Sequence, residues 1–427
     1  MDLLEPIIKP YAWGSREALA RLRGRDVPSA GPEAELWMGD HPAGSAGVTR
    51  DGRARTLTDV VHDDPERELG ADCVARFGGR LPFLLKVLAA DQPLSIQVHP
   101  DREQALAAFT AQTANGGEGP YSDDWPKPEL LYALSPFEVL AGFRDRAQAA
   151  AVLDGLGVRS LRPVIGLLGA EDEGTGLMAA LRALLEWPEP DRASLVREVV
   201  AASARLADTA GPHAAAYGAV VEMARHHADD IGLVASLLMR HQVLEAGTAL
   251  YMPTGGLHAY VRGVGVEIMA ASDNVLRAGL TTKEVDVPEL LRIADPTVQV
   301  PVVAPSAVAG RGRTHLYDCP AEEFALYRTE LTATPVPLVP SAGPRIVLCT
   351  AGEARLRSPD GEVLSLRRGD SCFVPDSDRG VTVEGNGTLF VAGTGLAVHR
   401  PNASRTDHPG TDTSPDIVVI GQFRTEE

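Results

Sequence analysis

The sequence predicts a mainly β protein with an α-helical insertion, built from two β-barrels and one helical domain. Short strand patterns with turns fill residues 1–143 and 241–303, an alanine-rich stretch with helical periodicity occupies 144–240, and strand patterns return over 304–427. A chain of 427 residues also exceeds the size at which one hydrophobic core keeps growing. We therefore expect one domain from the first two segments, an inserted helical domain, and a C-terminal β domain.

Two segments of the predicted β region carry polar residues at strand spacing. Gln97 and His99 stand at i and i+2 in LSIQVHPD, so their side chains point to the same side. A bare pair of this kind is also typical of half-exposed positions on a sheet face. Lys127 and Glu129 repeat the spacing in WPKPELL, where two prolines favour extended backbone.

The helical stretch shows one apolar face. Leu177, Leu181, Leu184 and Leu185 fall on one side of a predicted helix, which a proline pair at 188 and 190 ends. We interpret this stripe as a packed core face and assign it no chemistry. Because the stretch separates two β segments, its two ends must return to the same barrel.

LEAGTALYMPTGGLHAY, residues 244–260, predicts two strands around a glycine turn. Gly247 opens the first strand, Pro253 closes it, and the returning strand carries His258 and Tyr260 on one face. The pattern resembles the metal-binding signature of cupin barrels, which have jelly-roll topology. A lone histidine on a strand is also common as a core residue, so the prediction depends on finding further ligands.

Gln97, His99, Glu129 and His258 together form a nitrogen and oxygen ligand set. Imidazole with amide and carboxylate oxygens suits zinc, and such a site can keep a position open for water or substrate. The set contains no thiolate, which argues against a structural zinc site. Cobalt and manganese stay open as alternatives, because ligand type biases the choice of metal without fixing it.

The C-terminal segment repeats the glycine–proline turn without its histidine. In SLRRGDSCFVPDSDRGVTV, Gly369 and Pro375 match Gly247 and Pro253, and the position of His258 is taken by Gly380. This predicts a second, metal-free cupin-like barrel. The following tail is polar and turn-rich, and its apolar run IVVIGQF at 417–423 is compatible with a last strand.

Several motifs in the same order resemble type I phosphomannose isomerases. They are YAWGS, AELWMGDHP, LPFLLKVL, LSIQVHPD, KPELLYAL, FEVLAGFR, the glycine turn, and VEIMAASDNVLRAGLTTKEVD. The resemblance runs from about residue 9 to about residue 293. The resemblance implies a zinc enzyme, with one ion per subunit, that interconverts mannose 6-phosphate and fructose 6-phosphate. It places the metal on Gln97, His99, Glu129 and His258, and it implies a helical domain beside the site.

The same resemblance suggests roles for further residues. It places Arg277 in the catalytic centre and Ser95 and Lys283 at the phosphate. The other catalytic candidates are Lys127, Glu267, Tyr260 and Asp273, and the other substrate-binding candidates are Lys86, Trp13 and Glu35. Taken singly, each of these is also compatible with a surface charge, a packing contact or, for Asp273, a turn position.

The chemistry of aldose–ketose isomerisation constrains these assignments. A proton moves between C1 and C2 of the open-chain sugar through a cis-enediol, which needs a cation for the developing oxyanion and a base for the carbon-bound proton. Lys127, a zinc-bound water and a neighbouring carboxylate all stay open as that base. Two other functions also stay open, a metal-dependent cupin oxygenase and a non-enzymatic sugar-phosphate-binding cupin.

The composition argues against macromolecular anions as partners and favours a small-molecule substrate. A formal net charge of −18 and a pI near 5.1 argue against binding to nucleic acid or an anionic membrane. Four cysteines lack CxxC spacing, and we find neither a signal-peptide core nor a membrane-length apolar run. We expect a cytoplasmic, monomeric enzyme that attracts its phosphosugar through local cations.

Overall fold

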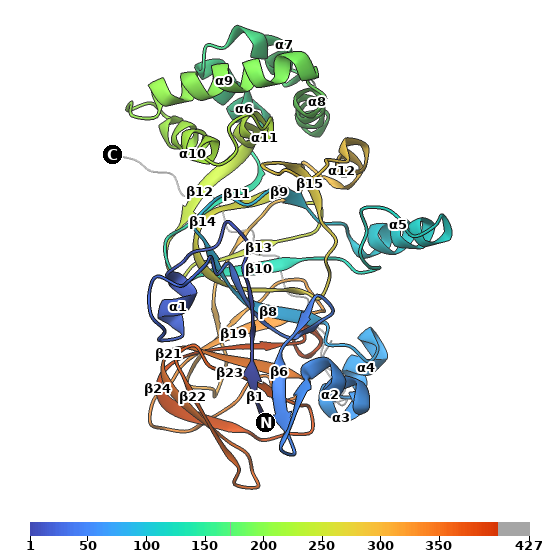
Figure 1. The fold of residues 1–427 in the computed structure, drawn as a ribbon, viewed down its shortest axis with the longest axis vertical. Helices are drawn as coiled ribbons and strands as arrows, with labels where there is room; N and C mark the ends of the chain where they lie inside the picture. The colour runs from blue at the N-terminus through green and yellow to red at the C-terminus, as the bar shows by residue number, and fades with distance from the viewer. Residues whose placement is uncertain (171, 400–427) are drawn as a thin grey trace, which may run out of the picture.

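The computed structural model describes residues 1–170 and 172–399. Figure 1 shows helices at one end of the long axis, strands in the middle, and a further β layer at the other end. The predicted strand at 417–423 lies outside the described residues. Within residues 1–170 and 172–399, the longest apolar helical stretches fall short of what a membrane span needs.

The middle of the molecule is one 11-stranded sheet. Its strands are β2 (Ile7–Lys9), β3 (Glu35–Met38), β8 (Phe83–Ala90), β9 (Ile96–Val98), β10 (Glu129–Ala133), β11 (Phe137–Phe143), β12 (Met239–Leu244), β13 (Ala249–Met252), β14 (His258–Ala270), β15 (Leu276–Gly279) and β16 (Val302–Val303). The main path runs β16-β13-β10-β14-β8-β3-β2, while β11 and β9 also pair with β14 and carry β12 and β15. This path is open at both ends, so the strand pairing defines no closed barrel.

Strand β14 joins the two halves of this sheet. Its first part, up to Arg262, pairs with β11 and β9, and its second part, from Gly263, pairs with β8 and β10. Gly263 has φ 145°, and a Cβ there would lie 2.6 Å from Cδ2 of Phe137. Only glycine fits this bend, which folds the half formed by β9, β11, β12 and β15 over the half formed by β3, β8 and β10.

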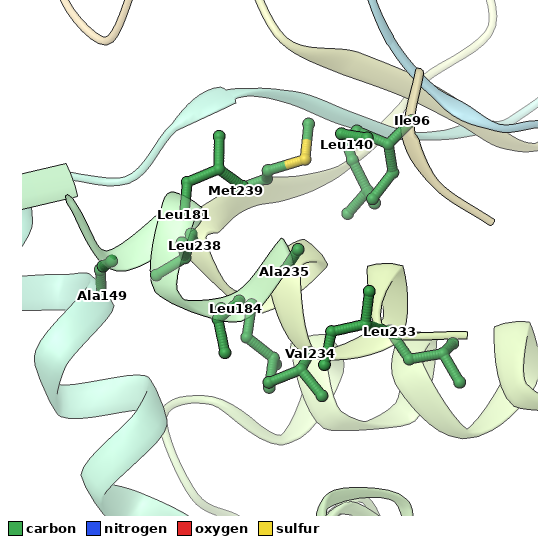
Figure 2. Close-up of a cluster of buried hydrophobic side chains, with 14 of the residues drawn as sticks. Ile96, Leu140, Ala149, Leu181, Leu184, Leu233, Val234, Ala235, Leu238 and Met239 are labelled. Atoms are coloured by element: carbon green, nitrogen blue, oxygen red, sulfur yellow. The ribbon is translucent and has the colours of Figure 1, made fainter. Parts of the chain in front are cut away.

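Helices fill the insertion. They are α6 (Arg146–Gly155), η1 (Arg159–Leu161), α7 (Arg162–Leu167), α8 (Glu173–Leu185), α9 (Glu189–Leu206), α10 (Ala214–Ala224), α11 (Gly232–Ala235) and η2 (Ser236–Leu238). The predicted leucine stripe on α8 is buried, as a core face should be. Figure 2 shows Leu181 and Leu184 in the apolar cluster that also contains Ile96 and Leu140 of the middle sheet.

A second 11-stranded sheet contains the C-terminal strands. They are β17 (Ser306–Ala307), β18 (Arg313–Tyr317), β19 (Ala325–Glu330), β20 (Val336–Pro337), β21 (Arg345–Arg357), β22 (Val363–Arg367), β23 (Ser371–Val374) and β24 (Thr382–Gly393), followed by α13 (Leu396–His399). The sheet is completed by three strands from the start of the chain, β1 (Asp2–Glu5), β6 (Gly47–Arg50) and β7 (Arg53–Thr56). The N-terminal segment therefore contributes strands to both sheets.

Short elements connect and cover these layers. They are α1 (Ala18–Leu22), β4 (Asp40–His41), β5 (Gly44–Ser45), α2 (Leu57–Asp63), α3 (Pro65–Leu69), α4 (Ala71–Phe77), α5 (Arg102–Ala114) and α12 (Val287–Ile293). Ion pairs from α4 and α5 reach the C-terminal unit, where Arg76 contacts Glu322 and Arg102 contacts Glu323.

The side chains of the middle sheet face three environments: the core shared with the C-terminal sheet, the space between the two halves of the middle sheet, and the helices. On β8, Leu85 and Val87 belong to the core shared with Ile346 and Phe390 of the C-terminal sheet. Leu88, on the opposite face, belongs to the space between the two halves of the middle sheet. Since the outer face of the other half is covered by the helices, the space between the halves is enclosed on both sides.

Gly263→Ala should destabilise the protein, because it adds both backbone strain and a clash with Phe137. We expect a loss of about 2–4 kcal/mol in the free energy of unfolding, measured by urea denaturation. Gly116→Ala is the control, since Gly116 has φ 111° but nothing within 4 Å of the added Cβ. Equal losses in the two variants would contradict a packing role for the bend at Gly263.

Candidate metal centre

One wall of the enclosed space is a row of residues across four strands. Ala141 of β11 stands opposite His258 of β14, His258 stands opposite Gln97 of β9, and Gln97 stands opposite Arg277 of β15. Residues directly opposite each other on neighbouring strands project from the same face of a sheet. The pairing therefore directs Gln97, His258 and Arg277 to one side, and the buried His99 follows β9 by one residue.

The facing wall carries Glu129 and a second row of polar residues. Glu129 begins β10, and two residues later Leu131 stands opposite Glu267 of β14. Glu267 stands opposite Lys86 of β8, and Lys86 stands opposite Trp37 of β3. These side chains thus share the face that looks toward His258.

His99, Glu129 and His258 meet at the centre. One ligand atom from each lies within 4.8 Å of the others, and all three side chains are buried. Nε2 of His99 is 3.4 Å from Oε1 of Glu129, and Nε2 of His258 is 3.3 Å from Oε2. Two ligand atoms on a tetrahedral zinc ion, each about 2.0–2.1 Å from the metal, are separated by a similar distance.

Both histidines are held so that Nε2 faces the centre. Nδ1 of His99 donates to the backbone oxygen of Asn274 at 2.7 Å, and Nδ1 of His258 donates to that of Gly256 at 3.0 Å. Such a bond fixes the tautomer that presents the lone pair of Nε2 to a metal. Nε2 of His99 is buried and has no hydrogen-bond partner among the described residues. These residues fit a bound cation, because a buried acceptor without a partner is costly otherwise.

Burial and charge around the centre set the protonation states of His99 and Glu129. Burial, together with the positive charge of Lys127, lowers the pKa of His99 to about 4, so this imidazole is neutral at pH 7. Burial alone would raise the pKa of Glu129, but the positive charge of Lys127 outweighs it and holds the pKa well below its usual range. A neutral imidazole and an ionised carboxylate are the forms that bind metals.

Lys127 and Gln97 lie directly beside this centre. Nζ of Lys127 is 2.7 Å from Oε1 of Glu129, although Lys127 precedes β10 instead of lying in it. The side-chain nitrogen of Gln97 donates to Oγ of Ser95 at 2.9 Å, which leaves its amide oxygen as the atom able to bind a metal. Ser95 thus has a partner in the site before any phosphate is considered.

A buried ion cluster adjoins the centre. Nζ of Lys86 lies 3.1 Å from Glu267 and 3.8 Å from Glu35, Tyr260 donates to Glu267 at 2.7 Å, and the indole of Trp37 donates to Glu35 at 2.6 Å. Burial alone would lower the pKa of Lys86, but Glu267 and Glu35 outweigh it and raise this pKa. Burial raises the pKa of Glu267. Four of the predicted site residues therefore lie in one network.

The remaining predicted residues are more exposed than the central cluster. Arg277 is half-buried, and burial lowers its pKa without a compensating carboxylate. Trp13 is half-buried and stacks on Tyr11, Asp273 is exposed, and Lys283 is exposed. The backbone nitrogen of Lys283 donates to Oγ1 of Thr281 at 3.1 Å. Among the described residues, its exposed ammonium group is not joined to the central cluster.

Two residues next to the site were not predicted to serve it. His41 is buried, with Nε2 3.6 Å from Oδ1 of Asp273, and packs edge-on against Trp37. Asn274 follows Asp273 and orients His99. Their sequence signal was weak, because each is a single polar residue outside the strand-spaced pairs.

The chain is similar to known proteins over most of its length. Residues 1–146 match the family described as phosphomannose isomerase type I, catalytic domain, and residues 315–393 match mannose-6-phosphate isomerase, cupin domain. The mannose-6-phosphate isomerase of Escherichia coli K12 is 33% identical over 91% of this chain and 98% of its own length. That of Schizosaccharomyces pombe is 32% identical over 86% of this chain and 92% of its own.

Solved structures agree with these relatives. A mutant of phosphomannose isomerase from Salmonella typhimurium superposes with a TM-score of 0.84 at 31% identity, covering 92% of this chain and 99% of its own. A mannose 6-phosphate isomerase bound with zinc and yttrium gives a TM-score of 0.83 at 31% identity, with the same coverage.

The β sheets and the buried histidine–glutamate cluster define a cupin-domain protein with a candidate metal centre. The chain belongs to the type I phosphomannose isomerase, or mannose-6-phosphate isomerase, family.

Lys86→Met should destabilise the protein in a pH-dependent way. It leaves Glu35 and Glu267 buried without their cation, which costs about 3–5 kcal/mol at pH 8. The pKa of Glu267 is already raised by burial, so protonation relieves the cost at low pH and the penalty grows as pH rises through that pKa. Thermal melts from pH 5 to 8 measure this difference.

Lys9→Met is the control for that substitution. Nζ of Lys9 also lies over the ring of Trp37, at 4.2 Å, but it bonds to a backbone oxygen in an exposed setting. We expect a small, pH-independent change. If the two variants showed the same pH profile, the buried ion cluster would not be the source of the effect.

Proposed function

We propose that this protein is a zinc-dependent isomerase that interconverts mannose 6-phosphate and fructose 6-phosphate through a cis-enediol, and so feeds mannose metabolism. The proposal rests on the cluster of His99, Glu129 and His258, whose Nε2 and carboxylate atoms converge in a buried site. It is supported by the names of relatives that match nearly the whole chain. A phosphosugar is thus the proposed partner.

Gln97, His99, Glu129 and His258 would hold the zinc ion. When bound, zinc supplies a positive charge that stabilises negative charge developing on a sugar oxygen. The ligand set carries one negative charge, that of Glu129, so a net positive charge would remain at the site. A metal-dependent oxygenase would also use histidines and a glutamate, and oxygen consumption discriminates it from the isomerase.

The neighbouring cations suit an anionic substrate. Arg277 projects from the same face as Gln97 and His258, and no carboxylate compensates its burial in the described part of the chain. A half-buried guanidinium of this kind favours a phosphate or an enediolate. We propose that Arg277 serves the reacting centre, while Ser95 and Lys283 contact the phosphate at the edge of the site.

We propose that Lys127, which lies beside Glu129, and Glu267 take part in proton transfer. Lys127 lies 2.7 Å from Glu129 and orients that carboxylate or carries a proton. Glu267 has a raised pKa and a hydrogen bond from Tyr260, which suits a carboxyl that exchanges protons. Glu35, Lys86 and Trp13 would line the sugar pocket, and Asp273 would close its rim.

The proposal extends to the division of the chain into domains. We propose a catalytic cupin barrel from 1–143 and 241–303, a helical insertion at 144–240, and a metal-free cupin-like barrel at 304–427. The separate apolar core of the C-terminal sheet supports this division, since it is filled by residues such as Cys349, Leu356 and Val391. The cytoplasmic location and the monomeric state stay predictions.

Isomerase activity should depend on zinc and on His258. A coupled assay of fructose 6-phosphate formation should lose activity on chelation and regain it with added zinc. His258→Ala should lower activity at least 1,000-fold and reduce zinc content, because it removes a ligand. His315→Ala, in the C-terminal β18, is the control. Sugar-phosphate binding without turnover in the zinc-loaded protein would favour the binding-protein alternative.

Lys283→Ala should raise the Michaelis constant for mannose 6-phosphate about tenfold with little change in kcat, if this lysine binds phosphate equally in ground and transition states. Arg311→Ala removes a half-buried cation from the C-terminal unit and should change neither constant. An unchanged Michaelis constant in Lys283→Ala would move the phosphate contact elsewhere.

A further inference from the structure

Asn274 is a buried polar residue with an unusual number of partners. Its side chain is 1% exposed and lies between β14 and β15. Its Nδ2 donates to the backbone oxygens of Asp123 and Trp125, both at 2.8 Å, and its Oδ1 accepts from the backbone nitrogens of Ser122 and Asp123 at 2.9 and 3.3 Å. One amide thereby bonds to the backbone of three residues in the segment 122–125, which we call the strap.

The strap leads directly to the metal centre. Trp125 lies two residues before Lys127 and four before Glu129, so the position of the strap sets where the chain enters β10. Trp125 is itself buried and packs beneath Arg80, whose guanidinium carbon is 3.7 Å from the ring centroid. The strap is therefore fixed by packing on one side and by Asn274 on the other.

The backbone of Asn274 reaches the centre from a second direction. Its carbonyl oxygen is the acceptor for Nδ1 of His99 at 2.7 Å, the bond that turns Nε2 toward Glu129. His99 and Glu129 come from separate strands, and Asn274 contacts the segments that carry both. Arg277 follows three residues later on β15.

The neighbours of Asn274 reinforce the same contact. Oγ of Ser272 donates to Oδ1 of Asp123 at 2.8 Å, and the backbone nitrogen of Asp273 donates to Oδ2 at 3.0 Å. Asn274 adds a third donor to this carboxylate, with Nδ2 3.2 Å from Oδ1. The carboxylate of Asp123 is thus occupied by neutral donors from 272–274 and is not available to a ligand or a metal.

We propose that Asn274 is a positioning residue for the metal centre, holding the imidazole of His99 and the segment before Glu129 in register. Its carbonyl fixes the ring of His99, and its amide prevents the strap, and with it Lys127 and Glu129, from moving away from that ring. A partner of this kind typically changes metal affinity by about 10–100-fold when it is lost. The inference rests on the proposed zinc site and adds a residue that does not touch the metal.

The test measures zinc affinity and stability separately. Asn274→Ala removes the amide, whereas Asn274→Asp keeps its shape but loses both donors and places a second carboxylate beside Asp123. Zinc dissociation constants come from competition with a chelator, and the melting temperature is measured on the metal-free protein. We expect the zinc dissociation constant to rise at least tenfold in both variants.

Two further variants serve as a matched control and as a milder substitution. Thr314→Val is the matched control, because Thr314 is 1% exposed and loses one buried side-chain hydrogen bond, to Thr329, in the C-terminal sheet. It should lower the melting temperature and leave zinc affinity unchanged. Ser272→Ala is a milder change, for use if the Asn274 variants do not fold, and should raise the zinc dissociation constant about threefold.

The outcomes separate this inference from the proposed function. Failure of the wild-type protein to bind zinc would overturn the metal site itself. If the wild-type protein binds zinc and the Asn274 variants bind it within twofold of the same affinity, the positioning role is wrong. A rise in the dissociation constant of Thr314→Val equal to that of Asn274→Ala would also overturn it, because the effect would then report general destabilisation.

Discussion

The site depends on a single buried carboxylate, that of Glu129. A charged carboxylate between two packed layers of strands would be costly without compensation. Nζ of Lys127, at 2.7 Å, provides that compensation from the same segment of chain. Nε2 of His258 and Nε2 of His99 reach the carboxylate from two other segments, at 3.3 and 3.4 Å, and would share a bound cation with it. The fold must therefore bring the end of β9, the start of β10 and the start of β14 together, and the other features of the molecule serve this requirement.

The layered architecture covers that space on both sides. The helices cover one outer face of the middle sheet through Ile96 and Leu140, and the C-terminal sheet covers the other through Ile346 and Phe390. Neither outer layer contributes a ligand to the cluster of His99, Glu129 and His258. Their contribution is burial, which strengthens electrostatic interactions inside the space.

The candidate residues differ in how far local sequence could find them. The i, i+2 spacing of Gln97 and His99 and the glycine turn before His258 are local signals, and the central cluster contains two of these three residues with Glu129. His41 and Asn274 gave no comparable signal. Asn274 acts through five hydrogen bonds to segments about 150 residues away, and no local pattern encodes such contacts.

The sequence by itself determined the strand periodicity, the helical insertion and the identity of the ligand candidates, because these follow from local spacing and from motifs in order. The tertiary structure decided which polar residues share a space. It joined Lys86, Glu35, Glu267 and Tyr260 into one buried network and left Lys283 exposed. The physical reason is that burial and charge pairing depend on the bend at Gly263 and on cross-strand register, which only the folded sheet defines.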